Sequence, residues 1–384
     1  MRVLFIAGYT HPAYHRKIEL LADAPDVEIL HVTVEGYGRE SGRYPSASGT
    51  NSYELKTFPA HYLGRDGDPH RSYLWPPHFA MRRFRPHIVH AESDVETLGT
   101  AQVAMARLAL ARRSPLVLYS WQNILRRRKL PVRLLARFNM AAADHIVCSS
   151  QEADDVLRRQ GFGAQSSIMP LVGVDTRYFF PRPVPELRQK LGLSGPESGL
   201  VIGFGGRLVA EKGVDTLLHA FAHIDVQSRL VLIGDGPEAD RLRALAHTLG
   251  VANRLSIVGS VSYDEVGDYM NALDILVLPS RTLPHWKEQF GRVLVEAMGC
   301  RIAVVGSDSG AIPEVIGNPA MIFPEGDALA LARILSRLIA DPDFRHTTAE
   351  QGFQRVQTHF TVERITQKLL SVWRDLVRSS TPLD

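Results

Sequence analysis

The segment Glu288-Gln-Phe-Gly-Arg-Val-Leu-Val-Glu296 decides the fold prediction, because it places two glutamates eight positions apart around a Phe-Gly step. A loop-like stretch precedes it and the apolar run Ile302–Val305 follows. This order predicts strand, loop, helix and strand, with the helix beginning near Phe290. A helix rises about 1.5 Å per residue, which would separate the glutamates by roughly 12 Å. Two carboxylates that flank one glycosidic bond lie about 5–10 Å apart. We therefore expect each glutamate to contact a different part of one long ligand.

The start of this helix predicts what lies between the glutamates. Free backbone N–H groups at Phe290, Gly291 and Arg292 would point out of the helix end, where the macrodipole favours anions. Gly291 has no side chain to keep a phosphate away from the backbone. A carboxylate, an anion cradle and a second carboxylate match the hydroxyls, diphosphate and ribose diol of a nucleotide-sugar. The candidate donor-binding residues in this segment are Gln289, Phe290, Gly291, Arg292, Val293 and Glu296.

Length and composition predict a globular protein with two domains. The chain has 384 residues and 45% of them are hydrophobic, which is enough for two cores. No apolar run reaches the ~18 residues of a membrane span, and the N-terminus predicts a buried strand rather than a signal peptide. Cys148 and Cys300 lack metal-ligand spacing, so we expect free, buried thiols in a cytoplasmic protein.

Charge is distributed unevenly along the chain. The net charge is only +3, but residues 1–172 contain 22 Lys and Arg against 16 Asp and Glu. The excess lies in Arg126-Arg-Arg-Lys129, Arg133 and Arg137. One interpretation is a solvated face. The other is a surface for an anionic acceptor, or for peripheral contact with the inner face of a membrane. We expect no nucleic-acid partner.

Short apolar strands alternate with helical patterns, which is typical of parallel sheets with helices on both faces. The predicted fold class is therefore α/β, with two Rossmann-like domains. Strands are expected over residues 2–7, 27–33, 87–91, 115–120, 145–149, 166–169, 200–205, 229–233, 255–258, 274–278, 302–305 and 320–323. Helices are expected over residues 13–23, 96–112, 131–142, 151–160, 213–223, 237–249, 264–272, 290–299, 327–340 and 361–378.

The boundaries of the domains follow from composition. Segment 35–80 is rich in Gly, Pro, Ser and Tyr without a clear period, which predicts a long loop region. A proline-containing connector begins at Pro170, and the alternation restarts after it. We therefore expect domains at 1–172 and 173–360, with a terminal helix within 361–384 that packs back on the first domain.

A second group of candidate residues opens the second domain, in Gly203-Phe-Gly-Gly-Arg207 and the following residues to Lys212. This segment is not a dinucleotide fingerprint, because Leu208 stands where the third glycine belongs. It leaves Arg207 and Lys212 as two cations at the carboxyl end of a buried parallel strand, where ligands bind. An arginine forks onto phosphate oxygens, and a lysine adds a point charge.

Taken together, these segments resemble the retaining glycosyltransferases of family 4, the group 1 glycosyltransferases, which have the GT-B fold of two Rossmann-like domains across a cleft. The residues that carry the resemblance are Gly173-Val-Asp-(x)3-Phe179-x-Pro181, Gly206-Arg207 with Glu211-Lys212-Gly213, Ile233-Gly-Asp-Gly-Pro237, Val258-Gly-Ser-Val261, Glu288-(x)7-Glu296-Ala-Met and Gly310-(x)2-Pro-Glu314. Each motif alone is weak, but all of them in this order are specific.

The resemblance implies catalytic roles. The residue at Glu288 contacts hexose hydroxyls and the one at Glu296 accepts the ribose diol. Arg207 and Lys212 hold the diphosphate and stabilise the departing nucleoside diphosphate, so neither metal nor cofactor is expected. The acceptor hydroxyl attacks the anomeric carbon from the same face from which the leaving group departs.

Further donor contacts are implied in both domains. The backbone at Ser260 and Val261 meets the base. Gly8, after the first strand, approaches the phosphate from the first domain.

The acceptor side departs from the family pattern. Many members carry a histidine after the fourth strand of the first domain, where this chain has Gln122 and Asn123. These side chains form hydrogen bonds but do not titrate. Contact with the donor sugar and capping of a turn both remain open for them. Further candidates on this side are His11, Glu92 and His285.

Two other functions remain open at this point. A nucleotide-sugar epimerase or hydrolase of the same fold is one. A non-catalytic nucleotide-sugar-binding protein is the other, because binding residues dominate the motifs. The base, the sugar and the acceptor are not assigned by the sequence.

Overall fold

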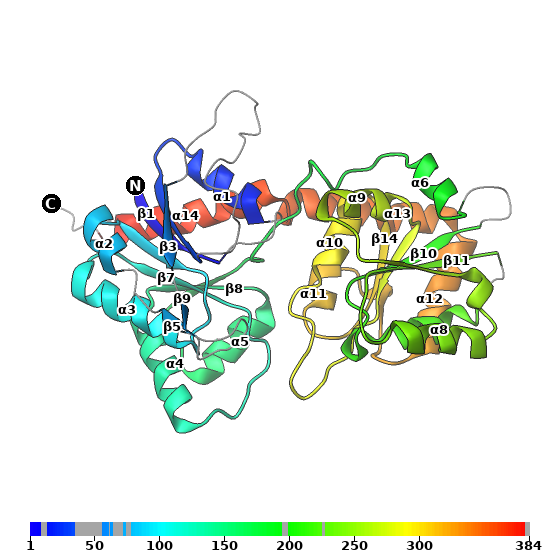
Figure 1. Ribbon diagram of the computed structural model, residues 1–384, viewed down its shortest axis with the longest axis horizontal. Helices are drawn as coiled ribbons and strands as arrows, with labels where there is room; N and C mark the ends of the chain where they lie inside the picture. Colours follow the sequence, from blue (N-terminus) through cyan, green and yellow to red (C-terminus); the bar gives the residue numbers. More distant parts are fainter. Residues whose placement is uncertain are drawn as a thin grey trace. The chain divides into compact units, whose positions relative to one another are not determined.

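The chain divides into two compact units (Figure 1). The first contains Met1–Gly173 and Val362–Asp384, and the second contains Val174–Thr361. This divide lies one residue after the position that the connector predicts. The structure, a computed structural model, describes residues 1–8, 14–34, 56–60, 62–63, 72–73, 78–193, 199–224 and 227–380.

The first unit is built on a parallel sheet of seven strands in the order β3-β2-β1-β6-β7-β8-β9. Its strands are β1 (Arg2–Ile6), β2 (Glu28–Val34), β3 (Lys56–Ala60), β6 (Ile88–Ala91), β7 (Leu116–Ser120), β8 (His145–Cys148) and β9 (Gln165–Ile168). Its helices are α1 (His15–Ala22), α2 (His78–Phe84), α3 (Leu98–Leu110), α4 (Leu130–Ala142), α5 (Gln151–Gln160) and α14 (Val362–Ser380).

The central strand β1 explains why helices cover both faces of this sheet. Successive side chains of a strand point to opposite faces. Val3 and Phe5 pack with α1 and α14, while Leu4 and Ile6 pack with α2, α3, α4 and α5. All four side chains are buried, which is why the strand is a continuous apolar run in the sequence.

The region from 35 to 80 is more structured than the composition predicts. The described part contains strand β3, which pairs in parallel with β2, and a short antiparallel pair, β4 (Tyr62–Leu63) with β5 (Ser72–Tyr73). The prediction of a loop region is wrong for β3. An edge strand of five residues with a proline inside it has too short a pattern to show a period of two.

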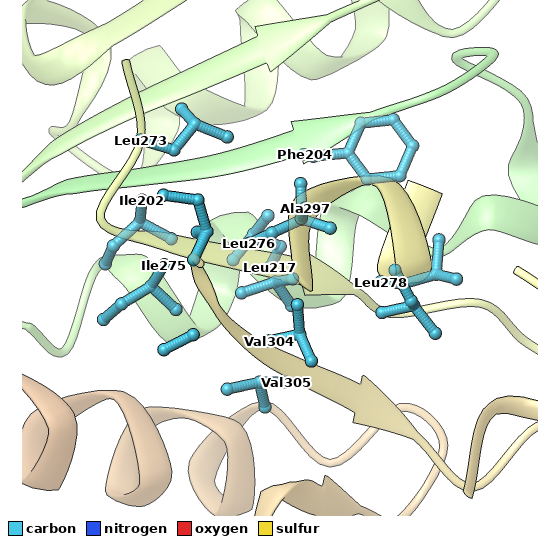
Figure 2. Packing of buried hydrophobic residues seen from close by; sticks show 14 of the residues in the cluster. Ile202, Phe204, Leu217, Leu273, Ile275, Leu276, Leu278, Ala297, Val304 and Val305 are labelled. Atoms are coloured by element: carbon cyan, nitrogen blue, oxygen red, sulfur yellow. The ribbon is translucent and has the colours of Figure 1, made fainter. Parts of the chain in front are cut away.

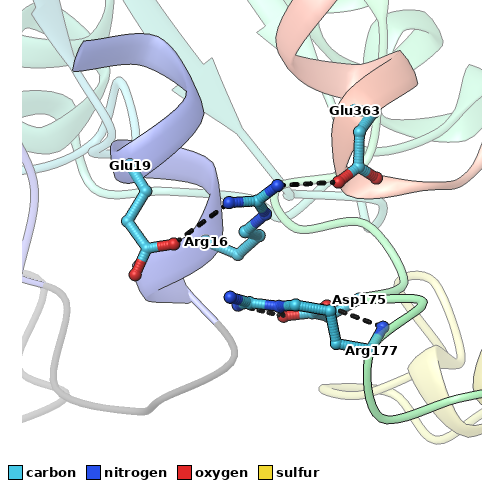
Figure 3. A network of polar contacts seen from close by, with 5 residues as sticks. All are labelled: Arg16, Glu19, Asp175, Arg177 and Glu363. Atoms are coloured by element: carbon cyan, nitrogen blue, oxygen red, sulfur yellow. Dashed lines mark hydrogen bonds and ion pairs between the residues drawn. The ribbon is translucent and has the colours of Figure 1, made fainter. Parts of the chain in front are cut away.

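The terminal helix α14 packs on the first unit. Trp373 is fully buried and its Nε1 donates a hydrogen bond to His90 Nδ1 at 3.0 Å. At the other end of the helix, Arg16 on α1 pairs with Glu363 on α14 and with Glu19, at 3.4 and 3.3 Å (Figure 3). The amphipathic pattern of the last segment therefore indicates a helix whose apolar face packs on the core of the first unit.

The second unit is built on a parallel sheet of six strands in the order β12-β11-β10-β13-β14-β15. Its strands are β10 (Val201–Gly205), β11 (Arg229–Ile233), β12 (Leu255–Gly259), β13 (Ile275–Leu278), β14 (Ala303–Ser307) and β15 (Ile322–Phe323). Its helices are α6 (Pro185–Lys190), α7 (Val214–Phe221), α8 (Ala239–Thr248), α9 (Tyr263–Asn271), α10 (Arg292–Gly299), α11 (Ile312–Ile316), α12 (Ala328–Ala340) and α13 (Pro342–His359). The long helix α13 has no counterpart in the sequence prediction.

A dry core holds this second sheet. Figure 2 shows Phe204 and Ile202 of β10 packed with Leu276 of β13, Ala297 of α10 and Val304 of β14. The ends of the unit meet where the Val174 N–H donates to the Phe360 carbonyl at 2.7 Å. Beside that point, Arg177 forks onto the carboxylate of Asp175 (Figure 3).

Both sheets have the strand order of a doubly wound fold. Counted along each sheet, the order is 3-2-1-4-5-6, with a seventh strand in the first unit. Ligands bind such sheets at the carboxyl ends of strands 1 and 4, where the order reverses. The predicted α/β class with two Rossmann-like domains is confirmed.

Two smaller predictions concern cysteines and membranes. Cys148 and Cys300 are free and buried, and burial raises the pKa of both thiols to about 12. Within the described part of the chain, no helix combines the length and apolarity needed to cross a bilayer.

Candidate functional site

The carboxyl edge of the second sheet contains a pocket of about 470 Å³. Its walls come from the segments after β10, β11 and β12, from the end of the loop after β13, and from α10. The predicted residues that line it are Arg207, Lys212, Ser260, Val261, Glu288, Gly291, Arg292, Val293 and Glu296. The fold therefore gathers one set of motif residues, spread over ninety positions, around the switch point of this sheet.

Glu288 is held at the pocket wall by two donors. Lys212 Nζ lies 2.6 Å from Glu288 Oε2, and Ser280 Oγ donates to the same oxygen at 2.8 Å. Lys212 Nζ also lies 5.1 Å from the centre of the Trp286 ring, within the range of a cation–π contact. Glu288 is 7% exposed, so a ligand can reach the carboxylate only from the pocket side. These contacts orient both charges before any ligand binds.

Arg207 is the most open cation of the pocket. Its side chain is 74% exposed, and its nearest carboxylate, that of Glu211, lies 4.0 Å away. Its guanidinium donors are therefore in solvent and are available to an anion in the pocket.

Glu296 lines the pocket from α10, one helical turn after the first residue of that helix. Arg292 Nε contacts Glu296 Oε1 at 2.9 Å. Burial raises the pKa of Glu296, and the neighbouring Arg292 opposes that rise. The buried carboxylate can accept hydrogen bonds from a diol that displaces water from the pocket.

The helix begins two residues later than the sequence predicts. The N-cap of α10 is Gly291, with φ 78° in the left-handed region, and the first helical residue is Arg292. Phe290 does not line the pocket, and its ring packs on the core, 5.7 Å from the ring of Phe360. The free N–H groups at the helix start belong to Arg292 and Val293, since the N–H of Leu294 already bonds to Gly291.

Gly310 explains the last motif of the resemblance. A Cβ at Gly310 would lie 2.0 Å from the carbonyl oxygen of Glu288, and the residue has φ +55°. The N–H of Ala311 also donates to that carbonyl at 3.1 Å. The segment after β14 therefore sets the backbone position of Glu288.

The remaining donor-side predictions divide. Gln289 and His285 are exposed and do not line the pocket. Gly8 is exposed directly after β1 in the first unit, and His11 lies outside the described residues. Sequence reasoning missed Asp235 in the pocket wall and Ser280 beside Glu288. Asp235 lies in the quoted motif Ile233-Gly-Asp-Gly-Pro237, whereas the signal for Ser280 was its position two residues after a buried strand.

Glu92 lies in the interior of the first unit. It pairs with Lys17, and both side chains are 2% exposed. Burial raises the pKa of Glu92, but Lys17 and His90 outweigh that effect and bring it to about 2. Lys17 also donates to the carbonyl of Leu171 at 2.8 Å. This contact set makes Glu92 part of the core rather than a surface for an acceptor.

Gln122 and Asn123 follow β7 and contact acidic side chains. Gln122 Nε2 lies 3.4 Å from Glu96 Oε2, and Asn123 Nδ2 lies 3.4 Å from Glu152 Oε2. Asn123 is buried, whereas Gln122 is half-buried. Both side chains thus connect neighbouring segments at the carboxyl edge of the sheet.

Asp94 is the most perturbed acid at this edge. It is buried, and among the residues that the structure describes its Oδ2 has no hydrogen-bond partner. Burial, reinforced by Glu96, raises the pKa of Asp94 to about 7. Asp94 therefore titrates near neutral pH. Over the described ranges, no three His, Cys, Asp or Glu side chains are grouped to hold a metal ion.

Comparison with known families agrees with this site. Residues 185–355, which cover nearly all of the second unit, match the family described as "Glycosyl transferases group 1". This match covers less than half of the chain, and it makes the second unit similar to the group 1 glycosyltransferases. The match spans every strand of the second sheet and every lining residue of the pocket.

The curated relatives that this chain resembles have names that describe different substrates. The N-acetyl-alpha-D-glucosaminyl L-malate synthase of Bacillus anthracis is 31% identical over 209 residues, which are 53% of this chain and 52% of that protein. A D-inositol 3-phosphate glycosyltransferase of Xylanimonas cellulosilytica is 32% identical over 248 residues, 61% of this chain and 57% of that protein. The chain spans about half the length of the curated relatives it matches.

Solved structures share this fold over nearly the whole chain. HepE of Anabaena, solved in complex with UDP, has a TM-score of 0.76 at 22% identity and covers 98% of this chain and 100% of its own. A sucrose-phosphate synthase from Thermosynechococcus elongatus has a TM-score of 0.73 at 21% identity, with 99% and 100% covered. Both units together therefore have the GT-B fold.

Proposed function

We propose that this protein transfers a hexosyl unit from a nucleoside-diphosphate sugar to an acceptor hydroxyl, with retention of the anomeric configuration. The observation that carries the proposal is the pocket of the second unit, whose wall contains two carboxylates, two exposed or half-buried cations and a helix start. The acceptor binds through the first unit in this proposal.

The groups that line the pocket support a nucleotide-sugar donor. In this proposal Glu296 accepts the ribose diol, and the N–H groups of Arg292 and Val293 bind phosphate oxygens. Arg207 and Lys212 supply positive charge beside the same position. Glu288, held by Lys212 and Ser280, is placed for hydroxyls of the hexose.

The proposed chemistry follows from the leaving group. The bond between the anomeric carbon and the diphosphate breaks with its electron pair on the phosphate oxygen. Arg207, Lys212 and the start of α10 stabilise that charge, so no metal ion is required. The acceptor oxygen bonds to the anomeric carbon on the same face, and its proton passes to the departing diphosphate oxygen.

A thermal-shift panel tests the donor. UDP, GDP and the corresponding glucose, mannose and N-acetylglucosamine conjugates are added to the purified protein, and UDP conjugates are included because HepE was solved with UDP-glucose. A ligand at 100 times its Kd stabilises the protein by about 2.7 kcal/mol. A panel in which nothing raises the melting temperature contradicts the donor assignment.

Product analysis separates transfer from the alternatives. Release of nucleoside diphosphate that depends on an added acceptor supports transfer, and an α-linked product from an α-linked donor supports retention. Release without acceptor indicates a hydrolase, and conversion of the sugar without release of nucleotide phosphate indicates an epimerase. Binding without turnover across a broad acceptor panel indicates a nucleotide-sugar-binding protein.

A further inference from the structure

The first unit contains a second pocket, of about 650 Å³, which is lined mainly by α4 and the segment before it. Its walls come from Glu96 after β6, from the segment between β7 and α4, from α4 and from the end of α5. Six of its lining residues are arginines, namely Arg126, Arg127, Arg128, Arg133, Arg137 and Arg159. We call it the arginine pocket.

Charge in the arginine pocket is almost entirely positive. Its one acid, Glu96, is already paired with Arg128. Among the residues that the structure describes, Arg127, Arg133 and Arg137 form no ion pair, and neither does Arg159 on α5. Guanidinium groups that share a concave wall repel one another unless an anion lies between them. Arg159 is distant in sequence, so the fold brings it to this wall.

The start of α4 adds to the positive charge. Lys129 is the N-cap, no side chain caps the first turn, and the turn contains no acidic residue. Pro131 in this turn has no N–H, so the groups without a partner inside the helix are the N–H groups of Leu130 and Val132, which lie with the positive end of the helix dipole beside the arginines. Several arginines around an uncapped helix start form a site for phosphate oxygens, which accept bidentate bonds from guanidinium groups.

Apolar side chains surround this charge. Ala136 and Met140 form buried parts of the pocket wall. On the outer face of α4, Leu130, Leu134 and Phe138 follow at intervals of four residues and are 64%, 54% and 37% exposed. Residues four apart lie on one face of a helix, so these three form a continuous apolar stripe next to the arginines.

We propose that the arginine pocket binds a phosphate group of an amphiphilic ligand, whose apolar part lies along the stripe on α4. The group is a phosphate ester or diphosphate, because these match both guanidinium forks and a helix start. Two sources share this chemistry, an anionic membrane lipid and a soluble phosphorylated compound. The stripe favours the lipid. The inference concerns binding and does not depend on the proposed transferase activity.

The test uses the whole protein and two kinds of probe. Vesicles of phosphatidylcholine with phosphatidylglycerol are compared with pure phosphatidylcholine in a flotation assay, and inorganic pyrophosphate is titrated calorimetrically. The pocket variant is Arg127→Ala/Arg133→Ala/Arg137→Ala. The matched control is Arg112→Ala/Arg113→Ala, which removes two exposed arginines of the same unit outside the pocket. Because the pocket of the second unit is unchanged in every variant, differences in binding between the variants come from the arginine pocket.

We expect the wild type to bind the anionic vesicles. The pocket variant should bind them roughly 100-fold more weakly, and the control variant should bind them as the wild type does. Leu130→Ser/Leu134→Ser should weaken vesicle binding but leave the pyrophosphate titration unchanged, which identifies a lipid as the source. A soluble source is identified when only the pyrophosphate titration depends on the arginines. Equal losses in pocket and control variants, or no binding of either probe by the wild type, overturn the proposal. Unchanged melting temperatures of the variants show that the fold is intact.

Discussion

Each unit contains a Lys–Glu pair at the same place in its topology, yet the two pairs have different surroundings. Glu92 follows β6 and Glu288 follows β13, the strand beside the first strand in each sheet. The Lys17–Glu92 pair has side chains that are 2% exposed, whereas in the Lys212–Glu288 pair they are 16% and 10% exposed. Exposure to a pocket, rather than residue type or position in the fold, separates a pair available for chemistry from one that supports the core.

The largest effect should come from the buried pair. Lys17→Met removes the cationic partner of the Glu92 carboxylate and one donor to the carbonyl of Leu171, and removing one partner of a buried pair costs about 3–5 kcal/mol. Urea unfolding should show this loss, while the affinity for nucleoside diphosphate stays unchanged. The double variant Lys17→Met/Glu92→Leu should recover part of the stability, because no unpaired charge remains. A single variant as stable as the wild type would contradict the assignment of this pair to the core.

The pocket pair should show the reverse pattern. Arg207→Ala or Lys212→Ala should lower turnover by 10²-fold or more, because in the proposed reaction each removes a charge that stabilises the departing diphosphate. Arg207 is 74% exposed, so its substitution should change the free energy of unfolding by less than about 0.5 kcal/mol. Arg243→Ala on α8, outside the pocket, serves as the control. Near-wild-type turnover by both pocket variants would refute the catalytic assignment.

Asp94 sharpens the comparison within the first unit, because its pKa is shifted opposite to that of Glu92. The pKa of Glu92 is lowered to about 2, so its contribution to stability is present above pH 4.5 and is lost as the pH falls toward 2. The pKa of Asp94 is raised from 3.8 to about 7, so stability is lost as the pH rises between these values.

Asp94→Asn should remove that second dependence. The variant should gain on the wild type by up to about 1.4 kcal/mol per pH unit between pH 4 and 7. Unfolding by urea at a series of pH values measures this slope. Asp155→Asn, at an exposed position of α5, is the control and should show no such slope. Parallel curves for wild type and Asp94→Asn would mean that Asp94 is ionised in the native protein.

The smallest effect should come from Trp286, which contacts Lys212 only through its ring. Trp286→Ala should lower turnover by about fivefold, the equivalent of a cation–π contact of roughly 1 kcal/mol. Trp286→Phe keeps a ring and should retain most of the activity. Steady-state kinetics should show the loss in kcat rather than in KM. An equal loss for Phe and Ala would indicate a packing role instead.

Most of the second unit could be predicted from the sequence, because local and tertiary signals agree there. Its strands are short buried apolar runs, and the ligand-side residues follow them directly, as Arg207 follows β10 and Ser260 follows β12. The start of α10 was missed by two residues. The left-handed backbone of Gly291 and the packing of Phe290 against Phe360 decide it, and neither is visible in a pattern of residue types.

The first unit was harder to predict, because the roles of its polar residues depend on whether each side chain is buried and paired. Glu92 and Asp94 are both acids after a buried strand, and only the tertiary structure places Lys17 beside one and no donor beside Oδ2 of the other. The arginine cluster was visible as a charge excess. That it forms a pocket depends on α5, which brings Arg159 to the same wall.

The sequence by itself determined the alternation of strands and helices, the division into two domains and the donor-site motif, because periodicity and turn chemistry are local properties. The tertiary structure alone decided which charges are paired in a core, which line a pocket and where an edge strand such as β3 joins the sheet. Those outcomes depend on contacts between segments far apart in the chain, and the free energy of a charge depends on its neighbours and its access to water.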